Sequence, residues 1–232
     1  MTHRRGADPN IAEVAALIGD PGRAAMLLAL LDGQDLAASA LASVAGMTPQ
    51  AATAHFKKLV AAGLLVSRSA GRHRFFRIAS PEVGHAIETL ATIARPAQIV
   101  ALDQSTTLER LRAARSCYDH LAGRLGVAVT ERLVEHRAIV RSGDDYALGA
   151  RGREFFAALG LDIENIQAER RRFGRACTDW TERRPHLAGS LGAGLLQLFV
   201  RKRWVARNSK DRALRITPDG ARELRRRLGV VW

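Results

Sequence analysis

One stretch of the chain, residues 39–79, constrains the fold more than any other. Within it, Thr48-Pro49 joins a capping residue to a proline at the first helical position, directly after a short apolar segment that ends in glycine. Apolar residues then recur at helical spacing. Two strand-like runs follow, Leu64–Arg68 and Arg74–Ile78, with basic residues between them. This order predicts two helices joined by a tight turn, and then a basic β-hairpin.

A helix, a turn, a second helix and a hairpin in this order form a winged helix-turn-helix, which places its second helix in the major groove of DNA. Residues near the start of that helix point towards the bases. A glutamine there pairs with adenine, alanine methyl groups touch the thymine methyl, and hairpin arginines suit phosphates. The candidate DNA-binding residues are Thr48, Gln50, Ala51, Thr53, Ala54, Lys57, Lys58, Arg68, Arg72, His73 and Arg74. The alternative is a packed helical hairpin with a solvated basic face.

The charge of the whole chain agrees with an anionic partner. The 232 residues carry 36 Lys+Arg against 23 Asp+Glu, a formal charge of +13. Such an excess favours nucleic acid or an anionic membrane surface. No run of about 18 apolar residues predicts a membrane-spanning helix, and no signal-type segment is recognised, so we expect a cytoplasmic protein. The two cysteines are too few for a disulfide framework.

Further helices are predicted around the central stretch, at Ile11–Ile18, Pro21–Leu31, Leu36–Ala45 and Pro81–Ile93. Arg95-Pro96 breaks the last of them, and we place a domain boundary at about residues 95–105. The predicted domains are 1–98, for DNA binding and dimerisation, and 99–232. The predicted fold class is mainly α with small β-hairpins (α+β).

The second domain contains an internal repeat. Arg115–Gly126 matches Arg175–Gly192, where the second copy carries the insertion Trp180–Pro185. Each copy continues into a predicted helix (Thr130–His136, Leu195–Lys202), a hairpin and a further helix. We therefore expect residues 105–232 to form two degenerate winged-helix-like units packed together. Small residues in each copy predict the contact between them: Ala122, Gly123, Gly126, Ala188, Gly189 and Gly192.

Residues 48–66, TPQAATAHFKKLVAAGLLV, resemble the recognition-helix signature of ArsR-type transcriptional regulators, and the Gly71–Ile78 hairpin resembles their wing. The likeness covers residues 10–95, and the second domain looks like that of longer members. The resemblance implies a homodimer formed by the first and last helices of the winged domain. It also implies a repressor whose DNA affinity is set by an effector.

The usual metal ligands of that family are missing. The predicted helix Leu36–Ala45 has no Cys, His, Asp or Glu, and Pro81–Ile93 offers only His85 and Glu88. The resemblance therefore does not supply the effector.

A separate set of candidate ligands lies in the repeat: Cys117, His120, Cys177 and His186. If they converge, they form a Cys2His2 set that suits zinc or another transition metal. On a helix, Cys117 and His120 would share a face. Two alternatives stay open. In the first, the free cysteines are small core residues, and Asp119 and Asp179 cap the helices that follow them. In the second, the thiols sense redox conditions.

The aromatic residues of the second domain are expected in the core, or alternatively around an apolar pocket for an organic effector: Tyr118, Phe173, Trp180, Phe199 and Trp204. No Gly-rich phosphate loop, metalloprotease helix or nucleophile elbow occurs in the sequence, so we predict no enzyme. We predict a sequence-specific DNA-binding transcriptional regulator, acting as a repressor. The alternatives are an architectural protein that binds nucleic acid without sequence preference, or a thiol- or metal-dependent sensor or enzyme in the second half.

Overall fold

The computed structural model describes residues 8–95, 102–208 and 211–232. The chain divides into two compact units, one ending at Gly84 and the other beginning at His85. Helix α5 (Pro81–Ile93) runs across this division. The predicted boundary at about residues 95–105 falls largely on residues 96–101, which lie outside the described residues.

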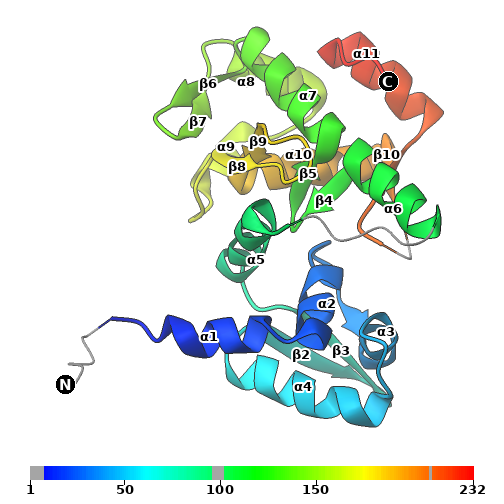
Figure 1. The fold of residues 1–232 in the computed structure, drawn as a ribbon. Coiled ribbons are helices and arrows are strands. Elements are labelled where there is room, and N and C mark those ends of the chain that lie inside the picture. The colour runs from blue at the N-terminus through cyan, green and yellow to red at the C-terminus, as the bar shows by residue number, and fades with distance from the viewer. Residues whose placement is uncertain (1–7, 96–101, 209–210) are drawn as a thin grey trace. The chain divides into compact units, whose positions relative to one another are not determined.

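The first unit has the predicted order of helices followed by a hairpin (Figure 1). Strands β2 and β3 pair antiparallel from Leu65 opposite Ile78 to Ala70 opposite His73, and β1 adds to β3. Its elements before α5 are α1 (Ile11–Ile18), α2 (Pro21–Ala29), β1 (Leu36–Ala37), α3 (Ala38–Val44), α4 (Pro49–Ala61), β2 (Leu65–Ala70) and β3 (His73–Ile78). The winged helix-turn-helix predicted for this region is confirmed.

Capping and apolar spacing explain these elements. Asp20 accepts a hydrogen bond from the backbone N–H of Arg23, and Thr48 accepts one from that of Ala51. A proline follows each cap, where its missing N–H costs no intrahelical bond. Phe56 of α4 stacks on Phe76 of β3 with ring centroids 4.2 Å apart. This contact fixes α4 against the hairpin and leaves its opposite face outward.

One predicted helix is wrong at its start. Leu36 and Ala37 form strand β1, opposite Phe76 and Phe75 of β3, and α3 begins at Ala38. The two residues complete the sheet through backbone bonds to a strand about 40 residues later in the chain, a partner that local spacing does not reveal.

The second unit contains the same order of elements twice: helix, hairpin, helix, hairpin, helix (Figure 1). The first repeat consists of α6 (Leu102–Ala113), β4 (Arg115–Cys117), β5 (His120–Ala122), α7 (Gly123–Glu135), β6 (Ile139–Ser142), β7 (Asp145–Leu148) and α8 (Gly152–Leu159). The second consists of α9 (Ile163–Ala168), β8 (Arg175–Thr178), β9 (Pro185–Ala188), α10 (Gly189–Arg201), β10 (Val205–Arg207), β11 (Leu214–Ile216) and α11 (Pro218–Leu228). The predicted internal repeat is confirmed.

The matching segments at the start of each repeat are hairpins, so the helical arrangement considered for Cys117 and His120 does not occur. Cys117 and His120 are cross-strand partners in β4–β5, with a turn at Tyr118 (φ 57°), and not neighbours on a helix face. The predicted helices at Thr130 and Leu195 are the later parts of α7 and α10, which begin at Gly123 and Gly189. Non-local pairing holds the short strands, because the backbone N–H of Ser116 donates to the carbonyl of Arg212.

The two repeats cross over each other. Strand β5 of the first repeat packs against α10 of the second, and β9 of the second packs against α7 of the first. A Cβ on Gly126 would lie 3.7 Å from the Cβ of His186, and one on Gly192 would lie 3.2 Å from that of His120. Gly126 and Gly192 are therefore close-approach positions between the repeats, as predicted. All four glycines, Gly123 and Gly189 included, also lie against carbonyls just upstream in their own repeats.

Among the described residues, no helix is long and apolar enough to cross a membrane.

Candidate nucleic-acid interface and buried Cys–His cluster

The outer face of α4 is polar and exposed. Ala52, Phe56 and Leu59 turn inward, because they recur at helical spacing and pack in the core. The predicted base-reading and backbone-contacting residues all lie on the exposed side of this helix or at its start: Thr48, Gln50, Ala51, Thr53, Ala54, Lys57 and Lys58. The Thr53 hydroxyl donates to the carbonyl of Pro49, so it is already oriented along the helix. The structure thus brings these seven residues together on one surface.

The wing β2–β3 carries the remaining predicted contacts, Arg68, Arg72, His73 and Arg74, and all four are exposed. Their surroundings differ. Arg68 is held by an ion pair with Asp35 at 2.7 Å and stacks over Phe75, whereas Arg72 lies in the turn. The guanidinium of Arg68 is therefore already engaged within the protein. Arg77, exposed on β3, is a further basic group of the wing. It was not among the predicted contacts, although the alternation of side chains along a strand predicts that it points outward.

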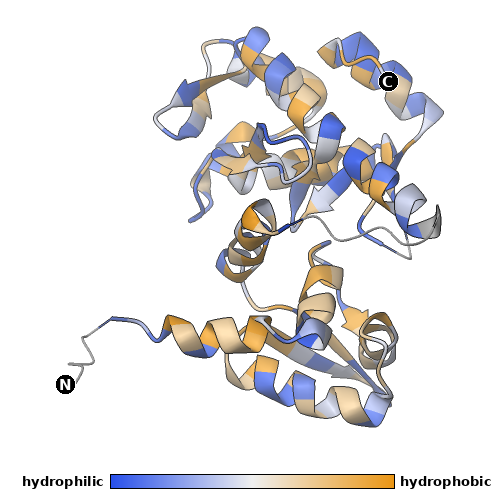
Figure 2. Cartoon of the chain, viewed as in Figure 1, coloured by the Kyte–Doolittle hydropathy of each residue, from blue (hydrophilic) through white to orange (hydrophobic). Residues whose placement is uncertain are grey.

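Helix α1 exposes apolar side chains. None of its eight residues is buried; Ile11 is 74% exposed and Val14 39%. Figure 2 shows this helix as mostly apolar. Helix α1 is thus an exposed apolar surface, a feature that marks interaction sites in proteins.

A second cluster lies inside the repeat unit. The hairpin β4–β5 contributes Cys117 opposite His120, and β8–β9 contributes Cys177 opposite His186. The two Sγ atoms are 3.8 Å apart, and the two Nε2 atoms are 3.1 Å apart. One ligand atom from each residue lies within 4.8 Å of all the others. The structure thus brings together the four predicted candidate ligands, from segments about 60 residues apart.

Charge within this cluster is unevenly distributed. A hydrogen bond with the Cys117 thiol, together with the imidazoles of His120 and His186, holds the pKa of the Cys177 thiol well below its usual range. Burial raises the pKa of Cys117. Although burial disfavours the charged imidazole, the bonds of His120 to Asp119 and Cys177 raise its pKa to about 9. The centre of the cluster thus favours a thiolate beside a positive charge.

Two aspartates stand behind the histidines. Asp119 Oδ1 lies 3.1 Å from His120 Nδ1, and Asp179 Oδ2 lies 3.8 Å from His186 Nδ1. Asp179 also accepts a hydrogen bond from the backbone N–H of Gly123 at 2.6 Å, so it caps α7 of the other repeat. The alternative in which Asp179 caps the helix that follows it in the chain is not what the structure has. Despite its burial, the nearby Arg115 guanidinium and the Thr181 hydroxyl keep the pKa of Asp179 well below its usual range.

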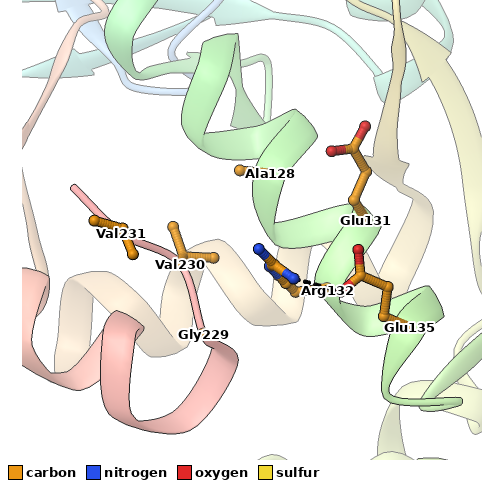
Figure 3. Close-up of a pocket in the computed structure, with 7 residues that line it drawn as sticks. All are labelled: Ala128, Glu131, Arg132, Glu135, Gly229, Val230 and Val231. Carbon is orange, nitrogen blue, oxygen red and sulfur yellow. Dashed lines mark hydrogen bonds and ion pairs between the residues drawn. The ribbon is translucent and has the colours of Figure 1, made fainter.

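The predicted aromatic residues do not line the pocket that Figure 3 shows in the described part of the chain. Phe199 and Trp204 are core residues, with ring centroids 5.0 Å apart. Figure 3 shows a pocket of about 220 Å³ lined by other residues: Ala128, Glu131, Arg132, Glu135, Gly229, Val230 and Val231. Arg132 and Glu135 form an ion pair within it. Its lining is charged on the α7 side, unlike the apolar effector site that the aromatics suggested.

Proteins of similar sequence place the chain in a family. A family model described as a helix-turn-helix domain matches residues 18–68. The uncharacterized HTH-type transcriptional regulator YdfF of Bacillus subtilis is 39% identical over 223 residues, which cover 96% of this chain and 99% of that protein.

Similar solved structures cover the N-terminal part. NolR from Sinorhizobium fredii is 25% identical, with 38% of this chain and 86% of that chain covered and a TM-score of 0.34. A homodimeric winged helix-turn-helix DNA-binding domain from Mycobacterium bovis, described as a possible ArsR-family regulator, is 26% identical, with 36% and 76% covered and a TM-score of 0.33. Because the sequence relationship to the Bacillus protein spans nearly both chains in full, this chain belongs to the HTH-type transcriptional regulators.

Proposed function

We propose that this DNA-binding transcriptional regulator is a sequence-specific repressor that acts as a homodimer. The observation that carries the proposal is the exposed face of α4, where Gln50, Ala51 and Ala54 are open to solvent beside Lys57 and the basic wing. Such a face has the two components that DNA recognition needs: groups that read base edges, and cations that neutralise phosphates.

The positions of these residues indicate which of them contact bases and which contact the DNA backbone. Gln50 stands in the first turn of α4, the part of a recognition helix that reaches base edges. Its amide suits adenine, which offers N7 as acceptor and the N6 amino group as donor. The wing arginines, at the far end of the hairpin, suit phosphates or a narrow minor groove.

Dimer formation is supported by α1. Its exposed Ile11 and Val14 offer the apolar surface that a second copy would cover. A two-fold dimer would present two α4 helices to half-sites about 34 Å apart, one turn of B-DNA. The ArsR-type resemblance of residues 10–95 assigns dimerisation to the same helix.

Regulation is assigned to the second unit. Its helices α7 and α10 pack mostly into the core of that unit, and neither has an exposed face with lysines like that of α4. We therefore place effector response there. An effector releases the repressor when it binds the DNA-incompetent state more tightly.

Fluorescence anisotropy tests the DNA-binding part. The full chain is titrated into a labelled duplex from upstream of its own gene and into a scrambled duplex, at two salt concentrations. We expect a preference of roughly 10³-fold or more for the native duplex. Gln50→Ala should reduce that preference, whereas Gln167→Ala, an exposed glutamine of α9 in the second unit, should not.

Equal affinity for both duplexes, unaffected by Gln50→Ala, would replace this proposal by an architectural protein. The direction of regulation is tested by in vitro transcription from the bound promoter. Transcript levels should fall as protein is added, and a rise would identify an activator.

A further inference from the structure

The cluster of Cys117, His120, Cys177 and His186 has no part in the proposed DNA contacts. Each hairpin supplies one cysteine and one histidine as a cross-strand pair, and the two pairs face one another across the repeat interface. Three of the four residues are buried, and Cys177 is partly buried. Their convergence therefore results from the crossed packing of the repeats and not from a local motif.

We propose that these four residues form a tetrahedral binding site for a metal ion of the zinc class, which links the two repeats. Two thiolates and two imidazoles form one of the common zinc ligand sets. With Zn–S of about 2.3 Å and Zn–N of about 2.0–2.1 Å, an ideal tetrahedron places the sulfurs about 3.8 Å apart and the nitrogens about 3.3 Å apart. The observed separations are 3.8 Å for the sulfurs and 3.1 Å for the nitrogens.

The orientation of the imidazoles favours a cation between them. The Nδ1 atom of His120 faces the carboxylate of Asp119, and that of His186 faces the carboxylate of Asp179. A carboxylate favours an N–H group at each of these positions. The two Nε2 atoms lie 3.1 Å apart, and both Sγ atoms lie close to them, so the four donor atoms converge on one centre. A metal ion at that centre would accept a lone pair from each Nε2, while the Nδ1–H of each ring faces its carboxylate.

The aspartates have the role of outer-sphere groups. Metal-bound histidines usually donate their second N–H to a carboxylate, which fixes the ring and its tautomer. Each aspartate here is in turn neutralised by an arginine: Arg171 lies 2.7 Å from Asp119, and Arg115 lies 2.9 Å from Asp179. These two pairs are neutral in sum. Two thiolates and one divalent cation are also neutral, so the filled site would bury no net charge.

The ligand set selects the class of metal. Thiolate and imidazole ligands in a tetrahedron suit Zn²⁺ and similar ions, while Mg²⁺ and Ca²⁺ require oxygen ligands. Packing alone is a weaker account of the cluster, because two fully buried imidazoles must be desolvated, and His186 Nδ1 makes no hydrogen bond among the described residues. The site is independent of DNA recognition, and its loss would leave that proposal unaffected.

Metal content and coordination test the site directly. Full-length protein is purified with a phosphine reductant and without chelator, stripped of metal, and titrated with Co²⁺. We expect one ion per chain, with the intense visible bands of tetrahedral cobalt and a thiolate-to-cobalt charge-transfer band. Zn²⁺ should displace the cobalt and raise the thermal unfolding midpoint. Cys117→Ser and Cys177→Ser should each remove the charge-transfer band or weaken it strongly. His136→Gln, a half-buried histidine of the same unit that lies outside the cluster, should leave the cobalt spectrum unchanged.

A second measurement uses only the wild-type protein, so it does not depend on whether the variants fold. X-ray absorption of the zinc-loaded wild-type protein should give a first shell of two sulfurs and two nitrogens. The proposal is overturned by a shell of oxygen and nitrogen alone, by weak octahedral cobalt bands, or by failure of the stripped protein to take up either metal. Cobalt binding that persists with an unchanged charge-transfer band in both cysteine variants would overturn it as well.

Discussion

Arg115 of the first repeat and Asp179 of the second form an ion pair in which neither side chain has any exposed surface, with Arg115 Nη2 at 2.9 Å from Asp179 Oδ2. The same carboxylate caps α7, and the guanidinium stacks over the ring of Trp180 at 4.6 Å. One buried pair thus connects a strand, a helix start and a loop from both repeats.

Arg115→Met is predicted to destabilise the protein strongly, because it leaves the carboxylate of Asp179 buried without its counter-charge. Breaking a buried pair in this way costs about 3–5 kcal/mol. Urea unfolding in metal-free buffer measures the change. The double variant Arg115→Met/Asp179→Asn should lose less than the sum of the two single variants. Asp144→Asn, at an exposed turn position, serves as control, and a loss for Arg115→Met no larger than the control's would contradict the prediction.

The matching backbone of the two repeats predicts similar sensitivity at two equivalent glycines. In Gly126→Ala the new Cβ would lie 2.5 Å from the carbonyl oxygen of Leu121, and in Gly192→Ala 2.4 Å from that of Leu187. Backbone must shift in both, which costs about 1–3 kcal/mol as overpacking does. Gly194→Ala in the same helix meets mainly flexible ends of side chains, and should cost less. Thermal unfolding compares the three, and a Gly194→Ala protein as unstable as the other two would refute this account.

The wing arginines are predicted to differ in their contribution to DNA binding. Arg72→Ala should weaken binding to native and scrambled duplexes alike, and should lower the slope of log affinity against log salt by about 1. Arg68→Ala should have a smaller effect, since the ion pair with Asp35 already engages that guanidinium. Arg201→Ala, exposed in the second unit, controls for net charge. If the Arg72 and Arg201 variants have identical salt slopes, the prediction that the wing contacts DNA is wrong.

Association through α1 is predicted to depend on its apolar surface. Ile11→Glu and Val14→Glu place charge where a second copy would pack, so sedimentation equilibrium should report a monomer. Leu28, 42% exposed on α2, provides a matched control as Leu28→Glu. If the Ile11 and Val14 variants sediment as the wild-type protein does, α1 is not the contact between copies.

Local signals predicted the elements whose stabilisation is local. Thr48 with Pro49 identified the start of α4, and the apolar spacing of Ala52, Phe56 and Leu59 identified its buried face. The helices Ile11–Ile18 and Pro81–Ile93 were predicted with the bounds they have in the structure. At these positions a cap, a proline or a repeated apolar spacing was sufficient.

The elements that were predicted wrongly depend on distant partners. Strand β1 exists because β3 pairs with it, and β4–β5 exists because the second repeat supplies backbone partners. The Cys–His cluster shows the same limit: residue types named the four candidate ligands, but nothing local showed that they converge, because their convergence follows from how the two repeats cross. The assignment of individual DNA contacts stays a prediction, since exposure alone does not identify them.

The way α7 begins has a consequence for how this chain acquires its structure during synthesis. The N–H of Gly123 is satisfied by Asp179, which leaves the ribosome more than fifty residues later. Without the second copy, the N–H of Gly123 and the guanidinium of Arg115 would lack this partner. We therefore expect the duplicated segment to fold as one cooperative unit.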